Sequence, residues 1–257
     1  MTPWTPFPYP GAYAFDVDRL RVRWADLHRG DAEPLPTNPN VLQAWVLFHN
    51  GAFQQAAEAG LALGDAGAAV ANKATCIYAN YLEPREEVRL SLLKAAASRA
   101  EAQQQRAPEQ ANAWYGQAYA LGRYSQGISV AKALTQGLGV RVKTALETTL
   151  RLAPQHADAH LALANFHAEV IDKVGSLIGG MTYGARKDAG LSLYRQALAF
   201  NPNSPITLGE YANGLLMLEG ESAAAQALNL QEQVAAFEPR DAMERLYVDA
   251  THLALQG

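Results

Sequence analysis

The chain has 257 residues, of which 49% are apolar, and its 21 lysine and arginine residues against 25 aspartate and glutamate residues give a formal net charge of −4. This composition indicates a buried core and excludes a wholly disordered chain, and the negative charge argues against nucleic acid as a partner. The lone cysteine, Cys76, excludes an internal disulfide, and we find neither an export signal nor an apolar run of membrane-spanning length, so we expect a cytoplasmic protein with no membrane partner.

Residues 1–15 form an N-terminal arm rich in proline and aromatic residues. Its prolines alternate with Trp4, Phe7 and Tyr9, and this proline density predicts an extended segment rather than a helix. Because aromatic side chains are costly to leave in water, we expect the arm to pack on the first helices or along a groove. The alternative is that the arm docks into a neighbouring copy of the chain and forms a homo-oligomer.

After the arm, the sequence predicts helices throughout. Asp16 and Asp65 each precede a helical run, and Pro84 opens a long helix. No alternating apolar and polar run bounded by a tight turn occurs, so strands are not required. We expect an all-α fold of about thirteen helices with one continuous core, forming a single domain over residues 1–257.

An internal repeat dominates the second half of the chain. The segment 107–114 (APEQANAW) recurs as 153–160 (APQHADAH) and more loosely as 201–208 (NPNSPITL), and a further proline follows at position 239. Proline just past a helix end cannot continue that helix, and the short polar residues after it can cap the next one. Each copy therefore predicts the end of one helix and the start of another.

These units resemble the tetratricopeptide repeat (TPR), a helix-turn-helix unit of about 34 residues. The characteristic first-helix positions of three successive units are occupied by Trp114, Ala118 and Leu121, then by His160, Leu163, Ala164 and His167, and then by Leu208, Tyr211, Ala212 and Leu215. The resemblance is clearest over residues 108–239. It implies a right-handed α-solenoid of antiparallel helix pairs, a TPR-like superhelix, that acts as a non-catalytic scaffold or adaptor for a protein or peptide.

Two units are longer than the family's repeat, with their extra residues at 122–137 and 168–187. Long inserts of this kind are similar to those in the TPR-like T components of bacterial tripartite solute transporters and, more loosely, to regulator-of-microtubule-dynamics proteins. The transporter components are exported lipoproteins, and this sequence lacks their export signal and N-terminal cysteine, so we do not carry their transport role over. The alternative function is a binding protein for a small apolar or anionic molecule, with a pocket closed by the inserts near Tyr124, Ile128, Leu177, Ile178, Met181 and Tyr183.

The resemblance also implies a peptide-binding groove, because the first helix of each TPR pair lines the concave face. Carried over by register, the groove residues are Asn112, Tyr115, Tyr119, Arg123, Asp158, Leu161, Asn165, Glu169, Glu210, Asn213 and Met217. Asn165 and Asn213 occupy the position where family members hydrogen-bond a ligand's backbone. Some family members also use a lysine in this groove to bind a terminal carboxylate, and other residue types stand at that position here, so we expect no such carboxylate clamp. The stripe is net acidic and partly aromatic, which favours a basic or apolar peptide. The alternative is that the arm or the inserts fill this face.

Three further features bear on chemistry. His156, His160 and His167 share one helix face, but the last lies about 10 Å along the axis from His160 and cannot share its metal ion, so we expect packing and no metal. The glycine-rich segment 175–187 lacks the Gly-Lys-Ser/Thr of a phosphate loop, which favours a structural turn over an anion site. No nucleophile and base can be paired around Cys76. We therefore expect no enzyme activity and no cofactor.

Overall fold

The computed structural model describes residues 3–256, and within that range the chain is helical and contains no strand. In chain order the helices are α1 (Val17–Leu27), α2 (Pro39–His49), α3 (Phe53–Ala62), α4 (Ala68–Tyr81), α5 (Glu86–Arg106), α6 (Ala111–Gln126), α7 (Val130–Thr135), α8 (Leu138–Leu152), α9 (Ala157–Val174), α10 (Ser176–Tyr183), α11 (Lys187–Phe200), α12 (Pro205–Glu219), α13 (Ala224–Ala235) and α14 (Ala242–Gln256), with short 3₁₀ turns η1 (Gly64–Gly67) and η2 (Gly220–Ala223). No described helix is long and apolar enough to span a bilayer.

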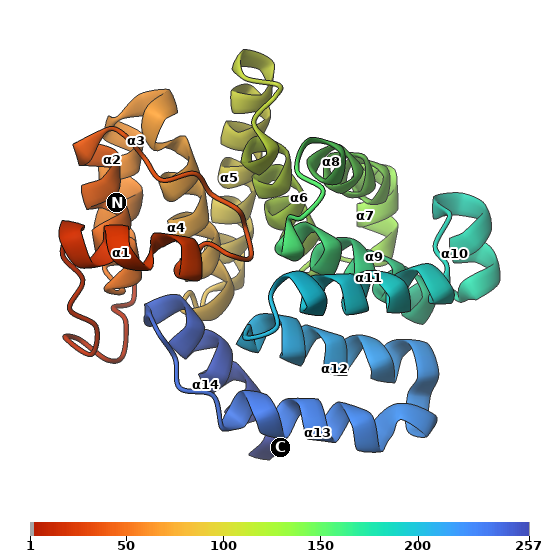
Figure 1. Ribbon diagram of the computed structural model, residues 1–257. Helices are drawn as coiled ribbons and strands as arrows, with labels where there is room; N and C mark the ends of the chain where they lie inside the picture. The colour runs from red at the N-terminus through yellow and green to blue at the C-terminus, as the bar shows by residue number, and fades with distance from the viewer. Residues whose placement is uncertain (1–2, 257) are drawn as a thin grey trace.

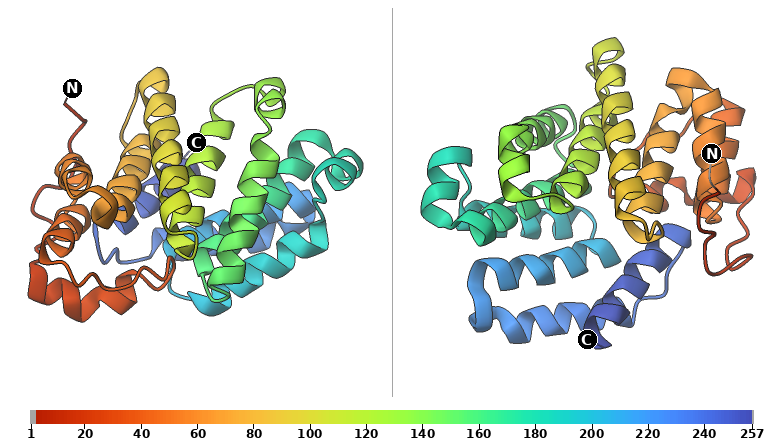
Figure 2. Two further views of the ribbon diagram at one scale, coloured as in Figure 1. Left: turned by 90° about the horizontal axis from the view of Figure 1, so that it is seen from above. Right: turned by 180° about the vertical axis from the view of Figure 1, so that it is seen from behind.

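The helices pack as successive antiparallel pairs. The pairs are α2 with α3, α4 with α5, α6 with α8, α9 with α11, and α12 with α13, and each pair stacks on the next. Figure 1 shows the pairs following one another around the molecule in chain order, and Figure 2 shows the same order from above and behind. The predicted all-α solenoid of helix pairs is confirmed.

Local sequence explains where many helices begin and how closely they approach. The Asp16 carboxylate caps α1 by accepting a hydrogen bond from the Arg19 backbone N–H at 2.8 Å. Pro205 opens α12 directly after the capping Ser204, a position where proline loses no helical hydrogen bond. The helix predicted to follow Asp65 starts with the 3₁₀ turn η1. Gly67 of this turn packs so closely on α3 that a Cβ at position 67 would lie 2.8 Å from the Gly60 Cα.

The N-terminal arm is extended and packs on the first helices. The Trp4 indole stacks on the Tyr78 ring, with centroids 4.0 Å apart, and the Trp4 backbone N–H donates to the Gln54 side chain at 2.9 Å. Phe7 is buried against Phe53, and Phe15 is buried beside His49. The aromatic residues of the arm thus belong to the core formed by α1–α4.

The two inserts contain the short helices α7 and α10. Helix α7 precedes α8, and α10 lies between α9 and α11. Figure 1 places α10 at the edge of the molecule, where Leu177, Ile178 and Met181 are exposed to solvent. The C-terminal end of α10 turns back to the body, because the Tyr183 carbonyl accepts a hydrogen bond from the Lys143 ammonium of α8 at 3.0 Å.

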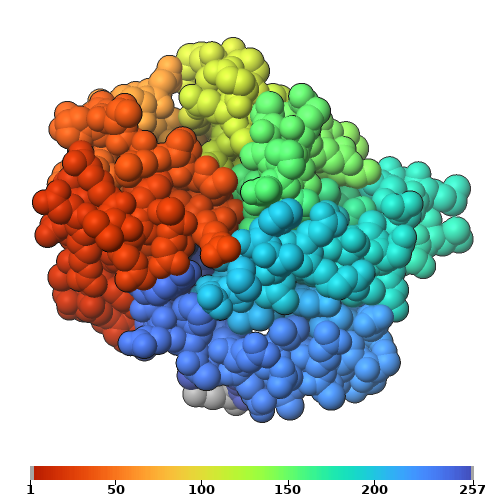
Figure 3. All heavy atoms as spheres, viewed as in Figure 1, coloured from red at the N-terminus to blue at the C-terminus, as the bar shows by residue number. Residues whose placement is uncertain are grey.

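The two ends of the solenoid meet, which the sequence did not predict. Helix α14 contacts α2 and α4, and the Asp241 carboxylate pairs with the His49 imidazole at 2.6 Å, both side chains being buried. The Arg240 guanidinium also donates to Asp26 of α1 at 2.8 Å. In the space-filling view the N-terminal third lies directly against the C-terminal helices (Figure 3). The segment between α1 and α2 also contacts the start of α9, since the Gly30 carbonyl accepts a hydrogen bond from the Asp158 backbone N–H at 3.0 Å.

Candidate functional site

A cavity of about 270 Å³ opens on the concave side between α6 and α9. These two first helices of neighbouring pairs scarcely touch each other, because α8 lies between them on the outer side. The cavity extends from the concave face toward α7 and the end of α10. Helix α12 contributes two side chains to its lining, and α14 contributes one. Its volume is near the lower end of the range for small-molecule pockets.

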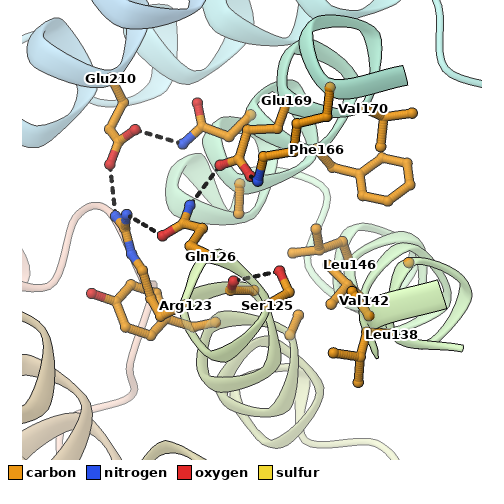
Figure 4. Close-up of a pocket in the computed structure, with 18 of the residues that line it drawn as sticks. Arg123, Ser125, Gln126, Leu138, Val142, Leu146, Phe166, Glu169, Val170 and Glu210 are labelled. Carbon is orange, nitrogen blue, oxygen red and sulfur yellow. Dashed lines mark hydrogen bonds and ion pairs between the residues drawn. The ribbon is translucent and has the colours of Figure 1, made fainter. Parts of the chain in front are cut away.

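The part of the cavity nearest the inserts is apolar. Its walls come from α7, α8, α9 and α10 and comprise Ile128, Val130, Leu134, Leu138, Val142, Leu146, Phe166, Val170, Val174 and Tyr183. Figure 4 shows Leu138, Val142 and Leu146 of α8 facing Phe166 and Val170 of α9. This part of the cavity suits an aliphatic or aromatic group.

The part nearest the concave face is polar, and three of its charged side chains are bonded to neighbouring side chains. Arg123 forms an ion pair with Glu210 at 2.6 Å, and Gln126 donates to Glu169 at 2.6 Å (Figure 4). Asn165 donates to the same Glu210 at 2.9 Å. Because Glu169 and Glu210 already have partners, Asp158 is the acidic side chain of this cavity that remains without one among the described residues.

Most of the predicted groove residues lie around this cavity. Eight of them line it: Tyr115, Tyr119, Arg123, Asp158, Leu161, Asn165, Glu169 and Glu210. Asn112 lines a smaller cavity nearby, while Asn213 and Met217 are exposed and line neither. The Asn165 amide, predicted to bind a ligand backbone, also accepts a hydrogen bond from the Tyr194 hydroxyl at 2.5 Å. The arm packs on the first helices, the inserts contribute Ile128, Val130, Leu134 and Tyr183 to the cavity wall, and the Gly30 carbonyl of the segment 28–33 bonds the start of α9.

The predicted small-molecule pocket needs a correction in its residues. Ile128 and Tyr183 line the large cavity, but Tyr124 is buried in the core of α5, α6 and α8. Leu177, Ile178 and Met181 face solvent on α10. They do so because α10 packs on α9 through its small residue Gly179, which leaves the large side chains on the outer side.

A smaller cavity of about 60 Å³ lies beside the large one and is surrounded by buried charges. Lys73 forms a short ion pair with Asp31, and the His28 imidazole bonds the same carboxylate at 3.0 Å. Burial lowers the pKa of His28 to about 4 and raises the pKa of Glu33 to about 7. These residues lie on α4 and the segment 28–33, and no spacing in the sequence indicates that they meet.

The three histidines of α9 and its cap take separate partners. The His156 ring bonds the Asn112 amide at 2.9 Å, His160 bonds the Pro154 carbonyl at 2.9 Å, and His167 accepts from the Arg186 backbone N–H at 3.2 Å. All three are buried. Residues 3–256 contain no group of three histidine, cysteine, aspartate or glutamate side chains placed to hold a metal ion.

Comparison with known proteins supports the fold. No protein-family model and no curated protein matches this chain. Among solved structures, a thermophilic TPR protein of Thermus thermophilus is similar, with a TM-score of 0.59 and 15% sequence identity, over 84% of this chain and 98% of that one. At this identity the similarity shows the fold alone, and the chain accordingly has the TPR-like helical-repeat fold that its proline turns predict.

Proposed function

We propose that this TPR-like solenoid is a non-catalytic scaffold that binds a segment of a protein partner on its concave face, with one side chain of that segment inserted between α6 and α9. The observation that carries the proposal is the cavity itself. It lies on the face that TPR-like folds present to peptides, and eight residues of the predicted groove stripe surround it.

The lining of the cavity favours an apolar anchor. Burying a large aliphatic or aromatic side chain there would contribute about 1.5–3 kcal/mol to binding. The polar side chains at the concave end, such as Gln126 at the end of α6, are placed to bond a peptide backbone. A partner segment with a single large apolar residue among polar ones fits both parts.

Two properties of the chain support a scaffold rather than an enzyme. Cys76, the lone thiol, is buried, and burial raises its pKa to about 12, which suppresses the reactive thiolate. The charged side chains Arg123 and Glu210 pair with each other rather than with an activated nucleophile. A cytoplasmic location and a single domain over residues 1–257 complete the proposal, supported by the lone thiol and by the contacts between the two ends of the chain.

Selection from a random peptide library displayed on phage tests the proposal, using the purified chain as bait. Selected peptides are then measured against Gly122→Leu, which places a side chain in the cavity from a helical position with no atom within 4 Å of a Cβ. The matched control is Ala199→Leu, which adds the same side chain to the exposed face of α11. We expect Gly122→Leu to lose binding and Ala199→Leu to retain it. Equal binding by both variants, or a library that yields no binder, would contradict the proposal.

A further inference from the structure

The two cavities meet at four side chains, which we call the tyrosine junction: Tyr115 and Tyr119 of α6, Asp158 of α9 and Tyr247 of α14. Each of these residues lines both the large and the small cavity. The Tyr115 and Tyr119 rings lie with centroids 6.2 Å apart and are tilted by 54°. A group that enters through the large cavity therefore reaches one carboxylate bordered by three phenol rings.

The tyrosine junction contains hydrogen-bonding groups that no described part of the chain satisfies. The Asp158 carboxylate takes part in no hydrogen bond or ion pair within residues 3–256, although its backbone N–H is bonded to Gly30. The Tyr119 hydroxyl is buried without a partner, and so is the indole N–H of Trp45, a fully buried residue that lines the small cavity. Buried polar groups are almost always paired, so these two unpaired donors beside an open cavity, together with the unpaired Asp158 carboxylate, indicate that a molecule in the cavity bonds them.

The cations nearest the tyrosine junction are already paired with other carboxylates, including Arg123, whose guanidinium lies 5.4 Å from the centroid of the Tyr119 ring. Two positive side chains lie near the junction, Lys73 in the lining of the small cavity and Arg123 in that of the large one. Each already forms an ion pair, Lys73 with Asp31 and Arg123 with Glu210. The nearby His156 imidazole stays neutral, because burial lowers its pKa to about 4. Asp158 therefore forms no ion pair among residues 3–256, although Lys73 lies near enough to lower its pKa, and an anionic ligand would be repelled by the ionised carboxylate.

We propose that the tyrosine junction binds a primary ammonium group on an aliphatic stem, the chemistry of a lysine side chain, with the ammonium at Asp158 and the stem in the large cavity. Ammonium groups are attracted both to a carboxylate and to the faces of aromatic rings, and this attraction grows when water is excluded. The apolar methylenes of a lysine stem suit the walls of the large cavity. The inference rests on the proposed function and refines its anchor, since the apolar group in the large cavity would be the aliphatic stem of a lysine of the partner segment.

Binding of a cation should release a proton from Asp158. Burial raises the pKa of this carboxyl to about 7, with Lys73 of α4 lowering it and Asp31 of the segment 28–33 raising it. A bound ammonium favours the ionised carboxylate, so the affinity is constant above pH 7. Below pH 7 the affinity falls by about tenfold per pH unit as the free carboxyl takes up its proton.

Isothermal titration calorimetry with defined probes tests the site on the full chain. The probes are Nα-acetyl-lysine methylamide, its uncharged isostere Nα-acetyl-norleucine methylamide, and n-butylamine. Titrations at pH 6, 7 and 8, each in two buffers of different ionisation enthalpy, measure the affinity and the number of protons released. The variants are Asp158→Asn and, as a control that removes a charge from the exposed part of α9, Asp172→Asn.

We expect the lysine derivative to bind, with proton release near pH 7 and at least tenfold weaker binding to Asp158→Asn but not to Asp172→Asn. Equal binding of the norleucine derivative, absence of proton release, or unchanged binding to Asp158→Asn overturns the site. If Asp158→Asn fails to fold, the norleucine comparison and the pH series on the unmodified chain decide the question.

The outcomes also separate this inference from the proposed function. Library peptides that are blocked by Gly122→Leu but bind equally with lysine replaced by norleucine support the scaffold and overturn the ammonium site. A lysine derivative that binds when no library peptide does supports the site and overturns the scaffold. Binding of n-butylamine as tightly as the lysine derivative keeps the site and identifies a free amine as a sufficient ligand.

Discussion

Replacing Gly214 of α12 by alanine should destabilise the protein, although alanine is the better helix former. A Cβ at position 214 would overlap the phenol ring of Tyr194, which is fully buried and stacked on Tyr211 with ring centroids 5.0 Å apart. The ring has no room to retreat, and any shift also breaks its 2.5 Å hydrogen bond to Asn165. Overpacking costs about 1–3 kcal/mol and the lost hydrogen bond about 1 kcal/mol, against a gain of about 1 kcal/mol in helix propensity.

The net expectation for Gly214→Ala is a loss of about 1–3 kcal/mol, or a fall of several degrees in melting temperature. The matched control is Gly122→Ala in α6, where a Cβ meets no atom within 4 Å, so helix propensity alone should stabilise it by about 1 kcal/mol. Urea denaturation followed by circular dichroism measures both variants. If Gly214→Ala is as stable as the unmodified chain, or if both variants shift in the same direction, the close packing of Tyr194 on α12 is wrong.

Four further predictions concern stability and its pH dependence. Burial raises the pKa of Glu33 from 4.5 to about 7, so the unmodified chain loses stability as the pH rises through that interval. Glu33→Gln should therefore be more stable than the unmodified chain by up to about 3 kcal/mol at pH 8 and equally stable at pH 4.5. Equal denaturation curves of the two proteins at pH 8 would contradict this. Asp241→Ala, which leaves the buried His49 unpaired, should cost about 3–5 kcal/mol at pH 7, against less than about 1 kcal/mol for the exposed Asp26→Ala, and similar losses would refute the importance of the buried pair. Since the pKa of Asp241 is lowered below 3.8, its contribution should be present above that pH and lost as the pH falls further. Deleting residues 1–13 should lower the melting temperature, because Trp4 and Phe7 leave the core, and an unchanged melting curve would make the arm dispensable. Addition of a chelator should leave the melting temperature unchanged, and a drop of several degrees would reveal a metal requirement.

The sequence predicts the repeat architecture because the signals for it are local. Proline turns and caps act within a few residues, so the boundaries around Pro108, Pro154 and Pro202 follow from the chain itself. The same register places Tyr115 and Asp158 on the concave face, where the structure has them. The fold could therefore be predicted from one sequence, while the binding role of the groove stripe stays a prediction.

The cavity and the buried charges could not be predicted in this way. They depend on how far neighbouring helix pairs rotate, a small angle per repeat that accumulates along the solenoid. The pair of His49 with Asp241 joins residues 192 positions apart, and neither residue carries a sequence signal that names the other. The hydrogen bond from the Tyr194 hydroxyl to the Asn165 amide likewise depends on a residue of another helix, because the Tyr194 ring packs against Gly214, where a Cβ would overlap it.

The meeting of the two ends has a consequence for how the chain folds during synthesis. In an open solenoid each repeat contacts only its neighbours, and folding can proceed from the N-terminus as the chain is made. Here Asp26 and His49 meet Arg240 and Asp241 only when these two residues have left the ribosome. Contacts of such large sequence separation slow folding, and they tie the first helices to the last in one cooperative transition. A nascent chain that stops before α14 should therefore remain protease-sensitive at its N-terminus, and the completed chain should unfold as a unit rather than repeat by repeat.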